Sequence, residues 1–364
     1  MVRTRISSAQ FFVAMFVSHI LVTIALNAQY TGGESILDNI ISCLLAMALG
    51  ALIALPVWLC MGRDSVPMGR GGSVPELAVG SMGKLGYIVP IGYWLYFLLA
   101  GGSSLALFQI FLMDTVNPGF SAGLVTAAIT GVALYGALRG IETVARCASC
   151  VLIVLLLGCG LVFGIVAVRF DTGNLEPLFQ YGYSQTARGT ALFLARTSLF
   201  ADMGVLLPQV AGKKGRGFMG WMIGTAAFVS LTILLISGCL GRYAYAQNFP
   251  VYVLASLTEV RSLQRLDAVF TGVWMMCLII KLAVDMYACR VCFFSMTGER
   301  EKKWPVWVTA VLLLLLALLA VGNSGVQALL LDPWALCLCT VITGAGLPLL
   351  TWAAALVRGK GAGK

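Results

Sequence analysis

The stretch ALFLARTSLFADMGVLLPQV, residues 191–210, is apolar at both ends and polar in its middle. It is long enough to cross the hydrocarbon layer of a membrane, which takes roughly 20 helical residues. Arg196, Ser198 and Asp202 nevertheless lie near its centre, and Pro208 follows them. Lipid satisfies neither buried charges nor freed backbone groups, so these residues need partners or a protein-lined cavity. We therefore expect this span to be broken and to face the interior of a helix bundle.

The rest of the chain supplies further apolar stretches of spanning length. Of its 364 residues, 60% are hydrophobic and only 11% are charged, which is more apolar surface than a soluble core of this size encloses. No stretch alternates polar and apolar residues over the length of a membrane strand, which favours helices over a barrel. We expect an all-α integral membrane protein with ten transmembrane helices. The expected spans are Ser8–Leu26, Ile36–Met61, Gly86–Met113, Ala122–Leu138, Val144–Val168, Ala191–Val210, Phe218–Leu240, Ala268–Phe294, Trp304–Val321 and Trp334–Val357.

The distribution of positive charge predicts the orientation of the chain. With the N-terminus in the cytoplasm, most Lys and Arg residues of the connecting segments fall on the cytoplasmic side, as membrane proteins prefer. Both termini are then cytoplasmic. The net charge of +9 fits this orientation and contact with anionic lipid. No basic stripe is interleaved with aromatic residues on a soluble module, so nucleic acid is not an expected partner.

The eleven cysteines and the single histidine, His19, do not predict a metal or redox site. The cysteine pairs lie in or beside apolar spans, where cysteine behaves as a small hydrophobic residue. The sequence contains no phosphate-binding loop, dinucleotide turn, nucleophile elbow or zinc-protease helix. We expect no enzymatic activity, no catalytic residues, no cofactor and no metal.

The ten spans divide into two sets of five, residues 1–168 and 191–357. In that division the first and sixth spans occupy matching positions, and the first carries Ser18 and His19 at its middle. In transporter folds built from inverted repeats, broken helices at matching positions hold a ligand near the middle of the membrane. The external stretch 241–267 and the cytoplasmic stretch 69–84 connect spans. Phe249 and Pro250 could open a short helix over the pocket, which makes the external stretch either a lid or a passive surface loop.

Two pairs of opposite charge are spaced four residues apart on one helix face. Lys281 and Asp285 lie within a span, where a charge costs roughly 2.5–3.5 kcal/mol on insertion scales. They are interpreted as a structural ion pair. Alternatively, Lys281 reaches Asp202 or a substrate carboxylate across the bundle, or it occupies the position where related transporters bind a coupling cation. Glu142 and Arg146 lie at the cytoplasmic end of the fifth span and are interpreted as a structural latch.

A resemblance to a known family runs through nearly the whole chain. The run GIETVAR at residues 140–146 resembles the Gly-Ile-Glu-x-x-Ala-Arg signature of the B subunits of bacterial spore germinant receptors, a family of the amino acid-polyamine-organocation superfamily. NLEPLF at 174–179, FAD at 200–202 and FPVY at 249–252 resemble further parts of its pattern. The stretch LQRLDAVF at 263–270, followed by Trp274 and Lys281, is the most specific part.

The resemblance implies a LeuT-like bundle, with a five-plus-five inverted repeat and broken first and sixth helices. It also implies a function. A small germinant, commonly an amino acid, would bind in a mid-membrane pocket and start germination. The chain would work with a membrane A subunit and a lipoprotein C subunit in the inner membrane of the spore. The alternatives left open are a proton- or sodium-coupled amino-acid transporter and a structural membrane subunit without a ligand.

The candidate ligand-binding residues come from the first, third, sixth and eighth spans. Two positions depart from the family pattern: the first span carries Val17-Ser18-His19 where the family has a small pair, and Asp202 replaces a glutamate. Each serine or threonine could instead bond back to the preceding helical turn, and His19 could sense pH or remain neutral and satisfied. The candidates are Ser18, His19, Thr23, Phe97, Gly101, Thr197, Ser198, Phe200, Asp202 and Lys281.

Overall fold

The computed structural model describes residues 6–24, 36–61, 72–116, 122–179, 182–257, 266–299 and 302–361. These residues are almost entirely helical, apart from two strands of two residues each. The helices are α1 (Ser8–Ile24), α3 (Asp38–Met61), α4 (Val74–Met82), α5 (Ile88–Phe111), α6 (Ala122–Arg139), α7 (Ile141–Val166), α8 (Tyr183–Ala195), α9 (Leu199–Leu206), α10 (Lys214–Leu240), α11 (Pro250–Ser256), α12 (Leu266–Thr297), α13 (Trp304–Gly322), α14 (Ser324–Leu331), α15 (Pro333–Val341) and α16 (Leu347–Gly361).

The all-helical membrane architecture expected from the sequence is confirmed. Within the described ranges, eight helical segments are long and apolar enough to cross a membrane. Two shorter apolar helices, Ser8–Ile24 and Gly123–Arg139, lie at the places of the first and fourth expected spans. The long apolar runs form helices because only intrahelical bonds satisfy the backbone in lipid.

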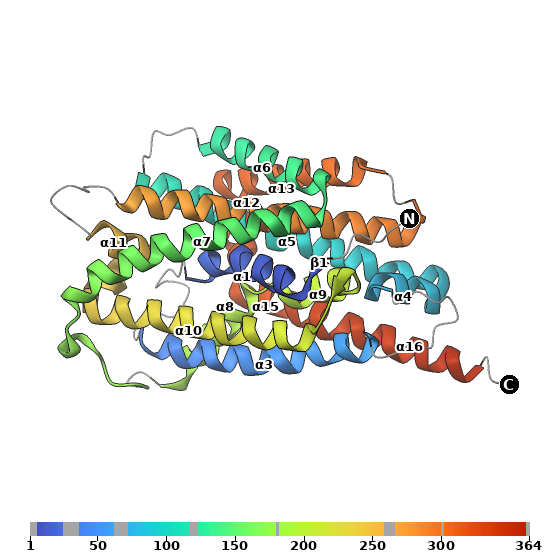
Figure 1. Ribbon diagram of the computed structural model, residues 1–364, viewed down its shortest axis with the longest axis horizontal. Coiled ribbons are helices and arrows are strands. Elements are labelled where there is room, and N and C mark those ends of the chain that lie inside the picture. Colours follow the sequence, from blue (N-terminus) through green and yellow to red (C-terminus); the bar gives the residue numbers. More distant parts are fainter. Residues whose placement is uncertain are drawn as a thin grey trace.

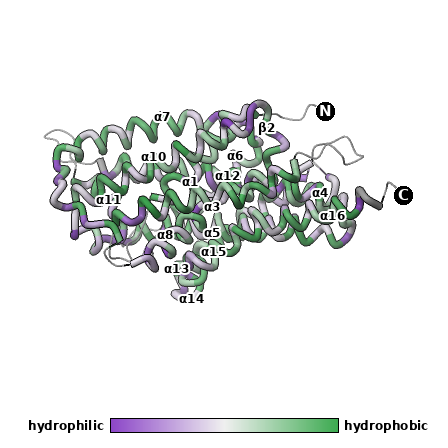
Figure 2. The backbone as a smooth tube through the Cα atoms, turned by 90° about the horizontal axis from the view of Figure 1, so that it is seen from below, coloured by the Kyte–Doolittle hydropathy of each residue, from purple (hydrophilic) through white to green (hydrophobic). Residues whose placement is uncertain are grey.

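The helices lie along one long axis, with α1 in the middle of the bundle (Figure 1). Helix α4 and the end of α16 lie at one end of that axis, and α11 lies at the other. Strand β1 (Ile6–Ser7) lies between α1 and α4, beside α9. Most hydrophilic segments gather toward these two ends, whereas the middle parts of the helices are hydrophobic (Figure 2). This distribution suits a bundle that crosses a membrane along its long axis.

The sixth span is broken, whereas the first is not broken within the described residues. Helix α8 ends at Ala195 and α9 begins at Leu199, so Arg196, Thr197 and Ser198 form the break that the sequence predicts. Helix α1 is continuous from Ser8 to Ile24, and residues 25–35 lie outside the described ranges. The expected break at Ser18 and His19 is absent because both side chains bond within the helix.

Several local features were not expected from the sequence. A π-helical turn, η7 (Ile342–Gly346), interrupts the tenth span between α15 and α16. Strand β1 pairs in parallel with β2 (Val210–Ala211), joining the segment before α1 to the segment after α9. Helix α4 stands in the stretch expected to be a cytoplasmic connection, whose first residues, 69–71, lie outside the described ranges. Ser73 and Glu76 form a capping box that starts α4.

The stretch 241–267 contains the short helix expected after Phe249. Helix α11 begins at Pro250, a residue suited to a first helical position. A 3-10 turn, η6 (Gly241–Ala246), precedes it, and residues 258–265 lie outside the described ranges. Phe249 packs against Phe111 with ring centroids 5.2 Å apart and against Trp274 at 6.0 Å. The short helix is therefore anchored on α5 and α12.

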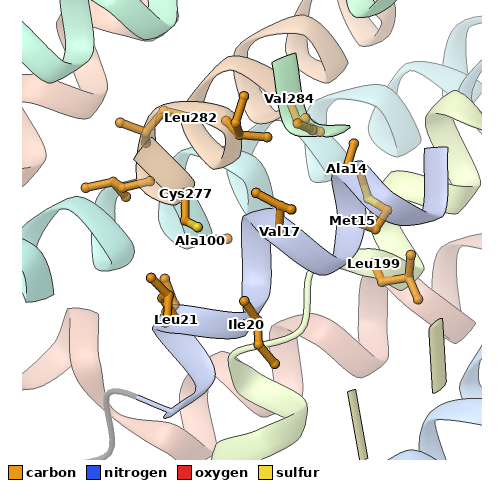
Figure 3. Close-up of a cluster of buried hydrophobic side chains, with 14 of the residues drawn as sticks. Ala14, Met15, Val17, Ile20, Leu21, Ala100, Leu199, Cys277, Leu282 and Val284 are labelled. Carbon is orange, nitrogen blue, oxygen red and sulfur yellow. The ribbon is translucent and has the colours of Figure 1, made fainter. Parts of the chain in front are cut away.

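The core surrounds α1. This helix packs against α7, α10 and α12, while α8 packs against α3 and α15. Figure 3 shows Met15, Val17 and Leu21 of α1 among Leu282 of α12 and Leu199 of α9. All five side chains are fully buried. Buried apolar side chains therefore surround the polar residues in the middle of α1 and of the sixth span.

Candidate functional site

The break between α8 and α9 places Ser198 in the centre of the bundle. The last turn of α8 tightens, because the Arg196 N–H donates to Leu192 O at 3.0 Å and the Thr197 N–H donates to Leu194 O at 3.1 Å. Ser198 then precedes α9 without capping its first N–H groups through its side chain. Its hydroxyl is consequently available for contacts with other helices.

Ser198 Oγ meets three groups from different parts of the chain. It lies 2.6 Å from His19 Nε2 of α1 and 2.9 Å from Asp202 Oδ2 of α9. Lys281 Nζ of α12 donates to the same oxygen at 2.9 Å. Each of these side chains is at most 2% exposed. Lys281 also pairs with Asp285. We call the five residues His19, Ser198, Asp202, Lys281 and Asp285 the serine junction.

The ring of His19 is fixed at both nitrogens. Its Nδ1 lies 2.7 Å from Met15 O and 2.8 Å from Ser18 Oγ. At the other side, the backbone N–H of Ser198 donates to Nε2 at 3.1 Å. These contacts hold the imidazole across the gap between α1 and the break in the sixth span. Ser18 thus reaches the serine junction through His19.

Lys281 and Asp285 form a bidentate ion pair on α12. Lys281 Nζ donates to Asp285 Oδ1 at 2.9 Å and to Oδ2 at 2.8 Å, and the two side chains are 3% and 0% exposed. A Cβ added at Gly101 would lie 3.0 Å from Asp285 Oδ2 and 2.9 Å from Leu313 Cδ2. Gly101 therefore leaves the space that Asp285 occupies.

Four other candidates from the sequence make local or packing contacts. Thr23 Oγ1 donates to His19 O and Thr197 Oγ1 donates to Phe193 O, each at 2.8 Å. These are bonds to the preceding helical turn, which satisfy the hydroxyl within its own helix. Phe97 packs against Tyr93 and Tyr96. Phe200 packs closely against Gly50 of α3 and Gly344 of η7. None of the four forms a described hydrogen bond with a side chain of the serine junction.

A second set of polar contacts joins α5 to the tenth span, and it was not expected from the sequence. Tyr93 Oη donates to Thr343 O at 2.8 Å, and Tyr96 Oη lies 3.0 Å from Thr340 Oγ1. The available signal was the run of Thr and Gly within an apolar span, at Thr340, Thr343 and Gly344. These contacts hold α5 against α15 and η7, and Gly344 of η7 lies against Phe200.

The second charged pair predicted from the sequence lies outside the serine junction. Arg146 donates to Glu142 Oε1 at 2.6 Å on α7, and the side chains are 70% and 41% exposed. The described residues contain no group of three or more His, Cys, Asp or Glu arranged to hold a metal ion. The described cysteines are free thiols.

The fold resembles that of a known sodium-coupled symporter. A solved structure described as the substrate-bound outward-open state of a Na+-coupled sialic acid symporter aligns with a TM-score of 0.63 and 12% identity. The alignment covers 98% of this chain and 90% of the symporter chain. At this identity the likeness shows a shared LeuT-type fold and nothing about the substrate.

The family follows from a separate comparison. A search of curated proteins finds no match. The family model described as spore germination protein, the spore permease family, matches residues 5–324. That range includes the whole of the serine junction and most of the membrane helices. The chain therefore belongs to the spore germination protein family, as the resemblance of its motifs implies.

Proposed function

We propose that the chain is the B subunit of a nutrient germinant receptor in the spore inner membrane, with both termini in the cytoplasm. A small germinant, an amino acid, binds at the serine junction and triggers germination. The family supports the role in germination, and the LeuT-type fold supports a ligand site in the middle of the bundle. The observation that carries the proposal is that Ser198 links α1, α9 and α12 at the only break of the sixth span within its described residues.

The break offers complementary ends to an amino acid. The first N–H groups of α9 have no partner within the helix, and they carry the positive end of its dipole. The last carbonyl groups of α8 point to the same break with the opposite sign. A carboxylate fits the start of α9, and an ammonium fits beside Ser198 and Asp202. The buried apolar side chains around α1 exclude water from both.

Binding at this position changes how the helices are joined. The His19–Ser198 and Lys281–Ser198 contacts tie α1 and α12 to the break. An ammonium that bonds to Ser198 Oγ replaces at least one of them. The ligand thereby favours an arrangement in which α1 or α12 is released, and the difference in affinity between the two arrangements supplies the signal.

The segment 241–267, on the external side in this proposal, is proposed as a lid over the serine junction. Its helix α11 packs through Phe249 on Phe111 and Trp274, and Tyr252 Oη donates to Asp267 Oδ2 at 3.1 Å. The Phe249–Trp274 and Tyr252–Asp267 contacts join helix α11 to α12, which also carries Lys281. Opening at Ser198 and movement of the lid are thus mechanically connected through one helix.

Ligand binding is tested on purified protein in lipid nanodiscs with the common amino acids, each added singly. We expect at least one to raise the melting temperature in a saturable way. Ser198→Ala should weaken that amino acid's affinity about ten- to a hundredfold, the loss of one hydrogen bond to a charged group. Glu142→Gln, which removes only an exposed ion pair, is the matched control and should bind normally. Stabilisation by no amino acid contradicts the proposal.

The receptor role is tested separately from ligand binding. Spores carrying the Ser198→Ala chain should need a higher germinant concentration, and the chain should copurify with a membrane A subunit and a lipoprotein C subunit. Concentrative uptake of the amino acid into vesicles by this chain alone would favour the alternative, a proton- or sodium-coupled transporter. Normal binding with no effect of the variant on germination would refute the receptor role.

A further inference from the structure

The contacts of the serine junction require more protons than its side chains supply in their usual forms. Met15 O is only an acceptor, so its 2.7 Å contact with His19 Nδ1 places a proton on Nδ1. The 2.6 Å contact between His19 Nε2 and Ser198 Oγ needs a second proton. The 2.9 Å contact between Ser198 Oγ and Asp202 Oδ2 needs a third. A neutral imidazole, a hydroxyl and a carboxylate supply only two.

Only two arrangements place a proton in every contact. In one, His19 is neutral, Ser198 donates to Nε2 and a protonated Asp202 donates to Ser198 Oγ. In the other, His19 is an imidazolium, its Nε2–H donates to Ser198 Oγ and Ser198 donates to an ionised Asp202. The backbone N–H of Ser198, which points at Nε2 from 3.1 Å, needs a lone pair there. It therefore selects the first arrangement, in which the single lone pair of Nε2 is shared between this N–H and the hydroxyl of Ser198.

In the selected arrangement Ser198 Oγ is fully used. It accepts from Lys281 Nζ and from Asp202, and it donates to His19. One proton and two lone pairs match three partners. Asp202 Oδ1 is buried and has no hydrogen-bond partner among the described residues. An unpartnered oxygen costs less free energy on a neutral acid than on a carboxylate.

The balance of charge among the five residues of the serine junction also favours the added proton. Lys281 and Asp285 neutralise each other, so an ionised Asp202 would leave the junction with a net negative charge beside neutral His19. The thiols and phenols nearby are neutral in ordinary conditions. Arg196, in the same break, is buried and has interactions of its own. The titratable groups that interact electrostatically with Asp202 include Lys281, Asp285, Cys289 and Cys292 of α12 and Tyr96 of α5.

We infer that the serine junction is a proton-binding site, in which Asp202 carries one exchangeable proton that it donates to Ser198. The proton leaves when a cation takes its place. If the proposed function holds, the ammonium of an amino acid bonds to the ionised Asp202 carboxylate, and each bound amino acid releases one proton. Ligand binding is then weaker at lower pH, because the proton and the ammonium compete for the same carboxylate.

The proton is detected without any ligand by infrared spectroscopy of the protein in nanodiscs at neutral pH. A protonated aspartic acid gives a carbonyl band above the amide bands, which shifts in heavy water and on isotopic labelling of aspartate. We expect this band in the wild type and its loss in Asp202→Asn. Glu142→Gln is the control and should retain the band. An identical spectrum for Asp202→Asn in this region overturns the inference.

Stability provides a second readout. The amide of Asp202→Asn donates to Ser198 Oγ as the neutral acid does, so the variant should melt within a few degrees of the wild type. A large drop in melting temperature leaves the decision to a second variant. If Asp202→Asn does not fold, Ser198→Ala serves instead, and the band should shift in frequency because its acceptor is gone. An unshifted band in that variant would also overturn it.

Proton release tests the link to the ligand. Calorimetric titration of the best-binding amino acid in buffers of different ionisation enthalpy should show one proton released per molecule bound. Binding without proton exchange, in a protein that shows the infrared band, refutes the coupling but leaves the proton site standing. Absence of binding together with the band refutes the proposed function alone.

Discussion

The buried pair of Lys281 and Asp285 makes a strong prediction about stability. Replacement of Lys281 by Met leaves the Asp285 carboxylate buried without its cation, and Asp285→Asn leaves the Lys281 ammonium without its anion. The pair is bidentate, with both side chains at most 3% exposed. Removal of one partner from such a pair costs about 3–5 kcal/mol. Each single variant should therefore lose that much of the free energy of unfolding.

The double variant separates pairing from other effects. Lys281→Met with Asp285→Asn leaves no uncompensated charge, only a buried amide that costs about 1–3 kcal/mol. It should be more stable than either single variant. Chemical unfolding in mild detergent measures all four proteins of the cycle. Glu142→Gln removes half of an exposed pair and should cost at most about 1 kcal/mol. Additive losses in the double variant would refute the account of the pair.

Three further predictions concern the packing of Gly344 against Phe200, the bond from Tyr93 to the tenth span, and the cap of α4. Gly344→Ala should cost about 1–3 kcal/mol of unfolding free energy, because its Cβ would lie 2.8 Å from Phe200 Cβ; Gly131→Ala, with nothing within 4 Å, should gain up to about 1 kcal/mol. Equal effects of the two in chemical unfolding would contradict this. Tyr93→Phe loses the bond to Thr343 O and should cost about 0.5–1.5 kcal/mol in the same assay, so unchanged stability would count against that bond. Ser73→Ala should speed hydrogen exchange at the start of α4 by loss of a cap worth about 1 kcal/mol, and unaltered exchange would refute the capping box.

Features that depend on local sequence were predictable. The apolar runs identify the helices because span length is set by the thickness of lipid. The break at Arg196–Ser198 follows from polar residues that lipid cannot satisfy. The spacing of Lys281 and Asp285 predicts their contact because residues four apart share a helix face. Each of these inferences uses only one segment of the chain.

Features that depend on contacts between segments were not predictable in the same way. The role of Ser198 as the shared partner of His19, Asp202 and Lys281 depends on how three helices pack. The first span was expected to break at His19, yet Met15 O accepts a bond from this ring and keeps the polar group satisfied inside a continuous helix. The pairing of β1 with β2 involves two residues on each strand. A pattern so short carries no signal in sequence.

The most direct test is a structure of the protein with the amino acid that stabilises it best. The account predicts density for the ligand between α1 and the start of α9, with its ammonium at Ser198 and Asp202. It also predicts that the His19–Ser198 contact, now 2.6 Å, opens beyond hydrogen-bonding distance. Density elsewhere, such as the apolar pocket beside Ile24 and Phe270, with that contact unchanged, would contradict it.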